Sequence, residues 1–276
     1  MKKIFIFGIL SAFFGLIAWS LPGDRAIAQT SQIQNNQIKK PMDINKKVPV
    51  LVELFTSEGC SSCPPADRVL AQLEKERTTA DAEIITLALH VDYWNYLGWK
   101  DEFSSSVYSQ RQNGYAEKFN LDSIYTPQMV VDGQNQFVGS NLGTAQKAIS
   151  EAAKSQKANI EISSVADLKN PKLKVNISDL PAHDNAFVWL AIAEDNLRTN
   201  VRRGENSGRM LNHVSVVREM KLLGNLASID KTFEAETALQ LSPAWKKENL
   251  KIVVFVQGKD SKRVFGVNRQ KLGIQG

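Results

Sequence analysis

The chain has 276 residues, of which 43% are hydrophobic and 23% are charged, and its formal net charge at pH 7 is +5. This balance is typical of a globular protein of one or two domains, and it excludes a collagen, a long coiled coil and a fully disordered chain. The basic residues are scattered and form no stripe with aromatic residues, so we expect no nucleic-acid partner. The chain has two cysteines, too few for a disulfide scaffold or a four-thiolate zinc site.

The first 28 residues have the pattern of a secretory signal. Lys2 and Lys3 precede an apolar run at 4–19, and the small residues that signal peptidase accepts follow at 26–28. The apolar run is shorter than the roughly 20 residues that cross a bilayer. We therefore expect cleavage after residue 28 rather than an uncleaved anchor, and no stable membrane insertion afterwards. Polar residues at 29–47 are predicted to form a flexible leader, and the predicted location is periplasmic or secreted.

Predicted strands and helices alternate in the segment that follows. In chain order they are a buried strand at 48–56, a helix at 66–76, a buried strand at 83–91, a helix at 103–119, a hairpin of strands at 128–131 and 136–138, and a closing helix at 142–157. Such alternation predicts an α/β domain at 48–157 whose sheet is covered on both faces.

The pattern changes to short strands after residue 158. They are predicted at 160–165, 173–177, 187–194, 214–220, 232–239 and 252–257. Several of them alternate apolar and polar residues, and helical periodicity is weak throughout. This pattern predicts a mostly antiparallel, sandwich-like β domain at 158–276.

The two cysteines lie between the first predicted strand and the first predicted helix. A helix N-terminus carries a partial positive charge and free N–H groups, which stabilise a thiolate. We expect Cys60, at the accessible outer end, to be the attacking thiolate and Cys63 to be the resolving thiol. Two other interpretations stay open. One is an inert structural disulfide, and the other is half of a metal site completed by His90, His183, His213 or a carboxylate.

Residues 48–157 resemble the thioredoxin superfamily through the strand, Cys-x-x-Cys, helix order and through Thr126-Pro127 before the third strand. The resemblance implies that Pro127 is cis and faces the cysteines, with the backbone of Thr126 as the docking edge for a substrate; an ordinary trans proline is the alternative. It also implies that an acid on the first strand shuttles the proton of the inner cysteine. Glu53 is the candidate for this role. Alternatively, the side chain of Glu53 faces solvent or forms an ion pair.

More closely, the chain resembles a family of secreted bacterial thioredoxin-like proteins of unknown function. The similarity rests on VELFTSEGCSSCPPAD at 52–67, HVDYW at 90–94, YTPQM at 125–129 and GENSGR at 204–209. The dipeptide between the cysteines, Ser61-Ser62, differs from that of thioredoxin proper. Because this dipeptide tunes the reduction potential, the direction of electron transfer stays open. Fold alone does not fix function.

Other candidate residues follow the second predicted strand. His90 and Asp92 lie at its end, where α/β sheets form binding crevices, and are predicted to bind substrate; for His90, a hydrogen-bonded structural role is the alternative. Trp94 belongs to an aromatic group at 93–99 that either offers a ligand a platform or packs against the β domain. For the charged loop at 202–209 we consider three roles: binding an anion, reaching over the dithiol, or forming a solvated hairpin.

The sequence thus predicts an extracytoplasmic thiol–disulfide oxidoreductase that uses Cys60 and Cys63 on protein or small-molecule thiols. No cofactor and no resident metal are expected, and the expected partners are extracytoplasmic protein thiols or a redox partner protein. The alternative is a non-catalytic binding module that handles a metal such as copper or docks an envelope partner. The predicted fold class is α/β, with a thioredoxin-like domain followed by a β domain.

Overall fold

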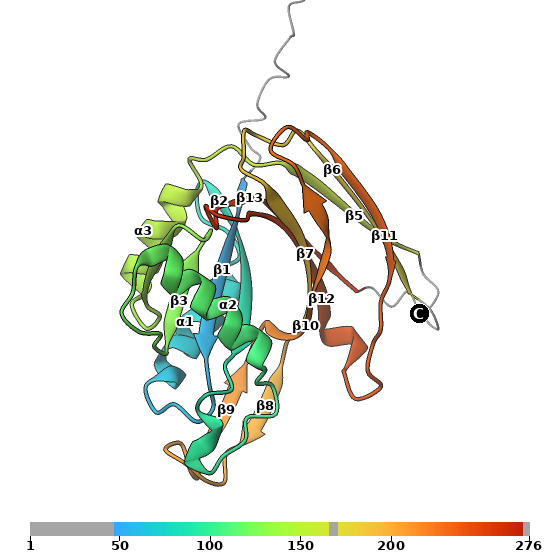
Figure 1. Cartoon of the computed structure of the whole chain (residues 1–276). Helices are drawn as coiled ribbons and strands as arrows, with labels where there is room; N and C mark the ends of the chain where they lie inside the picture. Colours follow the sequence, from blue (N-terminus) through green and yellow to red (C-terminus); the bar gives the residue numbers. More distant parts are fainter. Residues whose placement is uncertain (1–46, 166–170, 273–276) are drawn as a thin grey trace, which may run out of the picture. The chain divides into compact units, whose positions relative to one another are not determined.

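The structure is a computed structural model that describes residues 47–165 and 171–272. The expected signal at 1–28 and the expected leader up to residue 46 lie outside the described residues. The described part of the chain contains thirteen β-strands and three α-helices (Figure 1). None of the helices in these two ranges combines the length and the apolar composition that a membrane crossing requires.

The elements predicted between residues 48 and 157 are present in the predicted order. They are β1 (Val48–Thr56), α1 (Cys63–Glu76), β2 (Ala82–His90), α2 (Ser106–Phe119), β3 (Gln128–Val131), β4 (Asn135–Val138) and α3 (Leu142–Ala152), with a short 3₁₀ turn at Asn95–Leu97. Prolines at the first positions of α1 suit a helix start, because their fixed φ angle is helical and no N–H donor is needed there. The first turn of α1 therefore begins at the second cysteine.

The strands predicted after residue 158 are also present, with three additions. The strands of this part are β5 (Asn159–Val165), β6 (Lys172–Ser178), β7 (Ala186–Glu194), β8 (Leu197–Asn200), β9 (Met210–His213), β10 (Val216–Leu226), β11 (Phe233–Ala238), β12 (Leu250–Gly258) and β13 (Val264–Lys271). The sequence patterns did not predict β8, β9 or β13.

The predicted fold class is wrong, because one mixed sheet runs through both predicted domains. Its eight strands have the order β13-β12-β7-β10-β2-β1-β3-β4. The two halves join where β10 pairs with β2 in parallel, at Val216 and Ala88. The fold is thus mostly β and is not a thioredoxin-like α/β domain followed by a separate β domain. The predicted boundary between residues 157 and 158 falls between α3 and β5 and stays a prediction.

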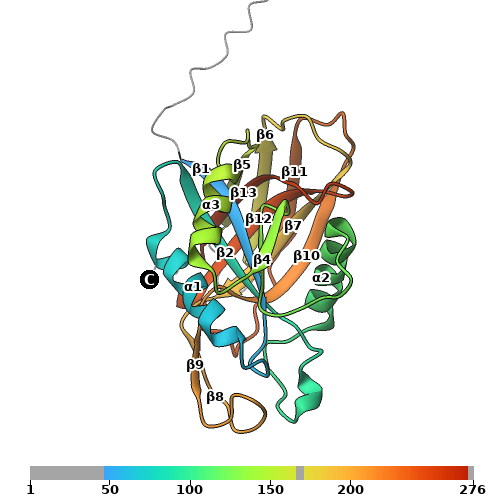
Figure 2. The same cartoon turned by 90° about the vertical axis from the view of Figure 1, so that its left-hand side faces the viewer.

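Side chains on the two faces of β1 belong to different cores. Val52 and Leu54 pack with residues of α1 and α3, such as Ala66. Leu51 and Phe55 pack instead with residues of α2, β7, β10, β12 and β13. Figure 2 shows α1 and α3 on one side of β1 and α2 on the other. This alternation decides which side chains of β1 can face the start of α1.

A second, three-stranded sheet with the order β11-β6-β5 covers part of the large sheet. Its apolar residues, such as Val175, form one core with Val188 of β7 and Val254 of β12. The strands β8 and β9 form a separate hairpin. The loop at its tip, residues 201–209, contacts the cysteines.

Candidate functional site

Cys60 and Cys63 form a disulfide at the start of α1. Both cysteines are 0% exposed, whereas Ser61 and Ser62 between them are exposed. The hydroxyl of Ser62, the residue that precedes α1, lies 3.3 Å from the sulfur of Cys60. The sequence therefore placed the pair correctly, but the expected accessibility of Cys60 is wrong for this conformation.

The peptide bond between Thr126 and Pro127 is cis, as the resemblance implied. This segment lies beside the cysteine loop, because the hydroxyl of Ser62 donates to the carbonyl oxygen of Thr126 at 3.5 Å. The indole N–H of Trp94 donates to the hydroxyl of Thr126 at 2.7 Å. Trp94 also packs closely on Gly59, since a Cβ at that glycine would lie 3.1 Å from the Cβ of Trp94. Thr126, Pro127 and Trp94 are thus brought together around the disulfide.

The loop at 201–209 contacts the cysteine loop directly. The side-chain amide of Asn206 is 0% exposed and donates to the carbonyl oxygens of Glu58 and Cys60, at 2.9 Å each. The carboxylate of Glu205 accepts the backbone N–H of Ser61 at 2.9 Å, and the hydrogen bonds from Ser61 lower the pKa of Glu205. The loop thus reaches the backbone of the cysteine segment, as one of its three considered roles requires, and it also forms the tip of the β8–β9 hairpin.

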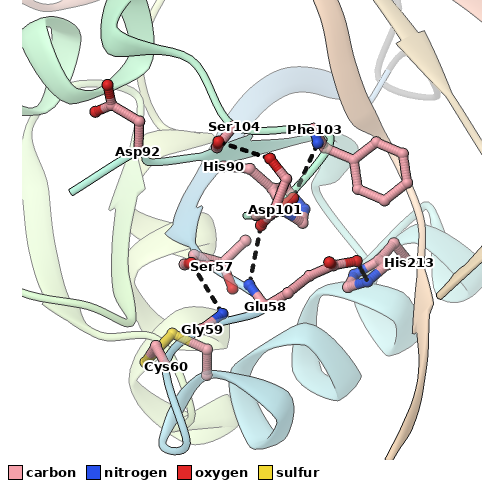
Figure 3. Close-up of polar contacts among 12 residues, drawn as sticks. Ser57, Glu58, Gly59, Cys60, His90, Asp92, Asp101, Phe103, Ser104 and His213 are labelled. Carbon is pink, nitrogen blue, oxygen red and sulfur yellow. Dashed lines mark hydrogen bonds and ion pairs between the residues drawn. A yellow bond between two sulfur atoms is a disulfide. The ribbon is translucent and has the colours of Figure 1, made fainter. Parts of the chain in front are cut away.

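A network of buried carboxylates and histidines lies behind the cysteine loop (Figure 3). Nδ1 of His90 is 2.7 Å from Oδ2 of Asp101, and the same oxygen accepts the backbone N–H of Glu58 at 2.9 Å. The carboxylate of Glu58 lies 3.2 Å from Nε2 of His213 and accepts the indole N–H of Trp99 at 2.8 Å. No group of three or more His, Cys, Asp or Glu side chains in the described ranges is placed to hold a metal ion.

His90 and Asp101 shift each other's pKa in opposite directions. Burial lowers the pKa of His90, but the charge and hydrogen bond of Asp101 outweigh burial and raise it above its ordinary value. Burial raises the pKa of Asp101, and His90 together with two backbone N–H groups outweighs burial and lowers it. The short contact with Asp101 therefore favours the protonated form of His90 more than burial alone would allow. Nε2 of His90 is also buried and has no hydrogen-bond partner among the described residues.

Asp67 is a further acid in this network, four residues after Cys63 on α1. Its carboxylate accepts the hydroxyl of Thr56 at 2.8 Å. Burial raises the pKa of Asp67, and the nearby imidazoles of His213 and His90 offset that rise only in part. Residues four apart share one face of a helix, so Asp67 and Cys63 lie on the same side of α1.

The structure does not bring Glu53 to the disulfide. Neighbouring residues of a strand point to opposite faces of the sheet, and Leu54 packs with α1. The side chain of Glu53 therefore points to the face that carries α2. There its two carboxylate oxygens lie 2.6 and 3.0 Å from nitrogens of Arg111, and it accepts the hydroxyl of Tyr115. Glu53 is therefore found in an ion pair, which was one of its two alternatives.

Asp92 also points away from the network in Figure 3. It accepts the hydroxyl of Ser109 at 2.6 Å. His90, by contrast, belongs to the network, and its hydrogen bond to Asp101 is the structural role given as the alternative. Of the two residues predicted at the end of β2, only His90 is connected to the cysteine loop.

Sequence reasoning missed Asp101 and named His213 only as a possible metal ligand, and it linked neither residue to Glu58. Asp101 lies 43 residues from Glu58, and His213 lies 155 residues from it. No local pattern links residues that lie so far apart in the sequence. Neither Asp101 nor His213 belongs to a short motif of recognisable spacing. Glu58 and Asn206 stood inside the motifs that carried the family resemblance, which was the one available signal for them.

Residues 51–257 match a family described as protein of unknown function (DUF1223). A structural-genomics target protein from Agrobacterium tumefaciens has a similar structure, with a TM-score of 0.65, 24% identity, and coverage of 84% of this chain and 97% of that one. At this identity the likeness shows the fold alone. A domain of the outer membrane lipoprotein Omp28 from Porphyromonas gingivalis has a TM-score of 0.25 at 19% identity and covers 44% of this chain and 92% of that one. No curated protein matches the sequence. The chain belongs to the DUF1223 family of proteins of unknown function.

Proposed function

We propose that the protein is a thiol–disulfide oxidoreductase whose Cys60–Cys63 pair exchanges with thiols of partner proteins or small molecules. The observation that carries this proposal is the pairing of the chain's two cysteines across two exposed serines at the first turn of α1. A disulfide that closes so short a loop removes little entropy from the unfolded chain and stabilises the fold little. A purely structural role therefore accounts poorly for the Cys60–Cys63 disulfide.

In the exchange reaction, a thiolate of the partner attacks the sulfur of Cys60. The bond between Cys60 and Cys63 breaks, a mixed disulfide forms with Cys60, and Cys63 leaves as a thiolate that takes up a proton. A second partner thiol then attacks the mixed disulfide and releases Cys60. Two partner thiols are oxidised to a disulfide, and the pair gains two electrons and two protons; the reverse reaction uses the same steps. The N-terminus of α1 favours the departing thiolate of Cys63.

The surroundings of the pair suit a protein substrate. The cis Thr126–Pro127 segment and Trp94 lie beside the cysteine loop and are the proposed contacts for an extended partner segment. Glu53 and Asp92 lie away from the disulfide, and we assign the chemistry to the cysteines alone. We also propose a periplasmic or secreted location, which the signal pattern at 1–28 supports; the partner there is a protein thiol or a redox protein.

Insulin reduction and exchange with glutathione test this function. We expect the wild-type protein to turn over in both assays and Cys60→Ser to lose turnover, because the sulfur that forms the mixed disulfide is missing and Cys63 alone cannot form the redox-active disulfide. Cys63→Ser is expected to accumulate the mixed disulfide at Cys60, since the resolving thiol is missing. Asn212→Ala, an exposed change on the neighbouring hairpin that leaves both thiols, is the matched control and keeps turnover. An inactive wild type, or a fully active Cys60→Ser, would contradict the proposal.

A further inference from the structure

The disulfide is closed off from solvent even though the residues between its cysteines are exposed. Cys60 and Cys63 are each 0% exposed. Thiol exchange needs an attacking sulfur to approach along the S–S bond, so the conformation described here does not admit a partner thiol. Some part of the surroundings has to move before the proposed reaction can begin.

The loop at 201–209 is built as a single unit with two buried residues, Val201 at its start and Asn206 near its tip. Its ends are tied together by backbone hydrogen bonds between Val201 and Arg209, at 3.0 Å, and between Gly208 and Val201, at 2.8 Å. Residues around Asn206 on both sides are exposed, whereas Asn206 itself is fully buried. Gly204 has a backbone φ of 76°, a conformation that residues other than glycine rarely adopt.

Asn206 holds this loop against the cysteines. Both hydrogens of its amide are used, one on the carbonyl oxygen of Glu58 and one on that of Cys60. Its own oxygen accepts Nη1 of Arg209 at 3.1 Å, which fixes the orientation of the amide. The carboxylate of Glu205 adds a third bond, to the N–H of Ser61. Three hydrogen bonds thus connect the loop to the backbone of Glu58, Cys60 and Ser61.

We infer that residues 201–209 are a lid over the disulfide, and that Asn206 is the positioning residue that decides which thiols reach Cys60. This inference rests on the proposed exchange function. In the conformation described here, the loop is bonded to the backbone of the cysteine segment while both cysteines are buried. A small opening admits a small thiol, and only full displacement of the loop admits the thiol of a folded protein. The lid therefore selects against protein thiols until a partner displaces it.

The test compares how fast a small and a large reductant reduce the disulfide. Dithiothreitol and reduced thioredoxin, a protein dithiol, are each used in excess on the full-length oxidised protein, and free thiols are counted by alkylation and mass measurement. Asn206→Ala is expected to accelerate reduction about 10- to 100-fold, as the loss of one or two buried hydrogen bonds implies. The acceleration should be larger for thioredoxin than for dithiothreitol, because the larger reagent needs the wider opening.

Asn212→Ala is the matched control. Asn212 lies on the same hairpin and is exposed, and its side chain accepts a hydrogen bond from Arg198 rather than contacting the cysteine segment. Its reduction rates should equal those of the wild type. Glu205→Ala provides a second lid variant, with acceleration in the same direction, and carries the test if Asn206→Ala does not fold.

Unchanged rates in a folded lid variant would overturn the inference. Equal acceleration for both reductants would also overturn it, because that result indicates a more reactive disulfide rather than easier access. The proposed function can fail separately. If the lid variants show the size-dependent acceleration but the protein never turns over insulin or glutathione, the lid stands and the oxidoreductase does not.

Discussion

Replacing Asp101 with asparagine is expected to lower the free energy of unfolding by about 3–5 kcal/mol, the effect of removing one partner from a buried ion pair. Asp101 is 1% exposed and His90 is 0% exposed, and the pair is 2.7 Å apart. The asparagine leaves a buried imidazole without the carboxylate that raises its pKa. It also weakens the acceptor for the backbone N–H of Glu58, which precedes Cys60 by two residues.

The effect of Asp101→Asn should depend on pH. The folded-state pKa of His90 is raised, so its contribution to stability is complete below the ordinary value of 6.5 and is lost as the pH rises through the raised value. The folded-state pKa of Asp101 is lowered, so its contribution is complete above 3.8 and is lost as the pH falls through the lowered value. The difference in the free energy of unfolding between wild type and Asp101→Asn should therefore be largest between pH 3.8 and 6.5. It should shrink as the pH rises above that window.

Urea unfolding of the two proteins across this pH range measures the difference. Asp92→Asn is the matched control, because Asp92 precedes the same loop and accepts a hydroxyl but pairs with no histidine. We expect that variant to change the stability by less than about 1.5 kcal/mol, the usual contribution of one hydrogen bond. A difference between wild type and Asp101→Asn that is small and independent of pH would show that His90 and Asp101 form no ion pair.

Lys251→Met is expected to destabilise the fold by about 3 kcal/mol, at the lower end of the range for breaking a buried ion pair. The amino group of Lys251 on β12 lies 3.0 Å from Glu74 of α1 and 3.1 Å from Asp195, and it donates to the hydroxyl of Ser215 at 2.7 Å. Lys251 and Glu74 are both buried. Methionine fills a similar volume but leaves both carboxylates short of a cation; Arg269 at 3.4 Å compensates Glu74 in part.

The midpoint and slope of urea unfolding measure this effect. Lys172→Met is the control, since Lys172 pairs with Glu236 at 3.3 Å on the surface, where both side chains are more than half exposed. Such surface pairs contribute less than about 1 kcal/mol. Lys251 connects α1, which begins at Cys63, to β12 in the C-terminal half of the chain. If Lys251→Met lowered the free energy of unfolding no more than Lys172→Met does, that result would argue against one cooperative fold.

Local patterns were enough to predict most of the elements. The apolar run at 48–56 and the helical spacing after Cys63 predicted β1 and α1 because strands and helices have different periods. The fold class could not be read in this way. It depends on the pairing of β10 with β2, which joins residues such as Val216 and Ala88 across more than one hundred positions of the chain. Such a pairing leaves no period in the sequence, so the change of pattern near residue 158 suggested separate domains.

The site was predictable to the same extent. Cys60 and Cys63 were found from their spacing and from the helix that follows them. The role suggested for Glu53 depended on which face of β1 it occupies, and a strand residue changes face with each step along the chain. Asp101 and His213 are brought to Glu58 by a loop and by the hairpin of β8 and β9, whose position relative to the cysteine loop no local pattern fixes. The contact of Asn206 with the cysteine segment likewise joins residues that lie 146 positions apart in the chain.

The reduction potential of the Cys60–Cys63 pair tests the proposed function most directly. The protein would be equilibrated in glutathione and dithiothreitol buffers of known potential, and its thiols would be alkylated and counted by mass. We predict one reversible two-electron transition between about −270 and −120 mV, the span from thioredoxin to strongly oxidising dithiol proteins. A pair that stays oxidised below about −300 mV, as structural disulfides do, would contradict a role in thiol exchange.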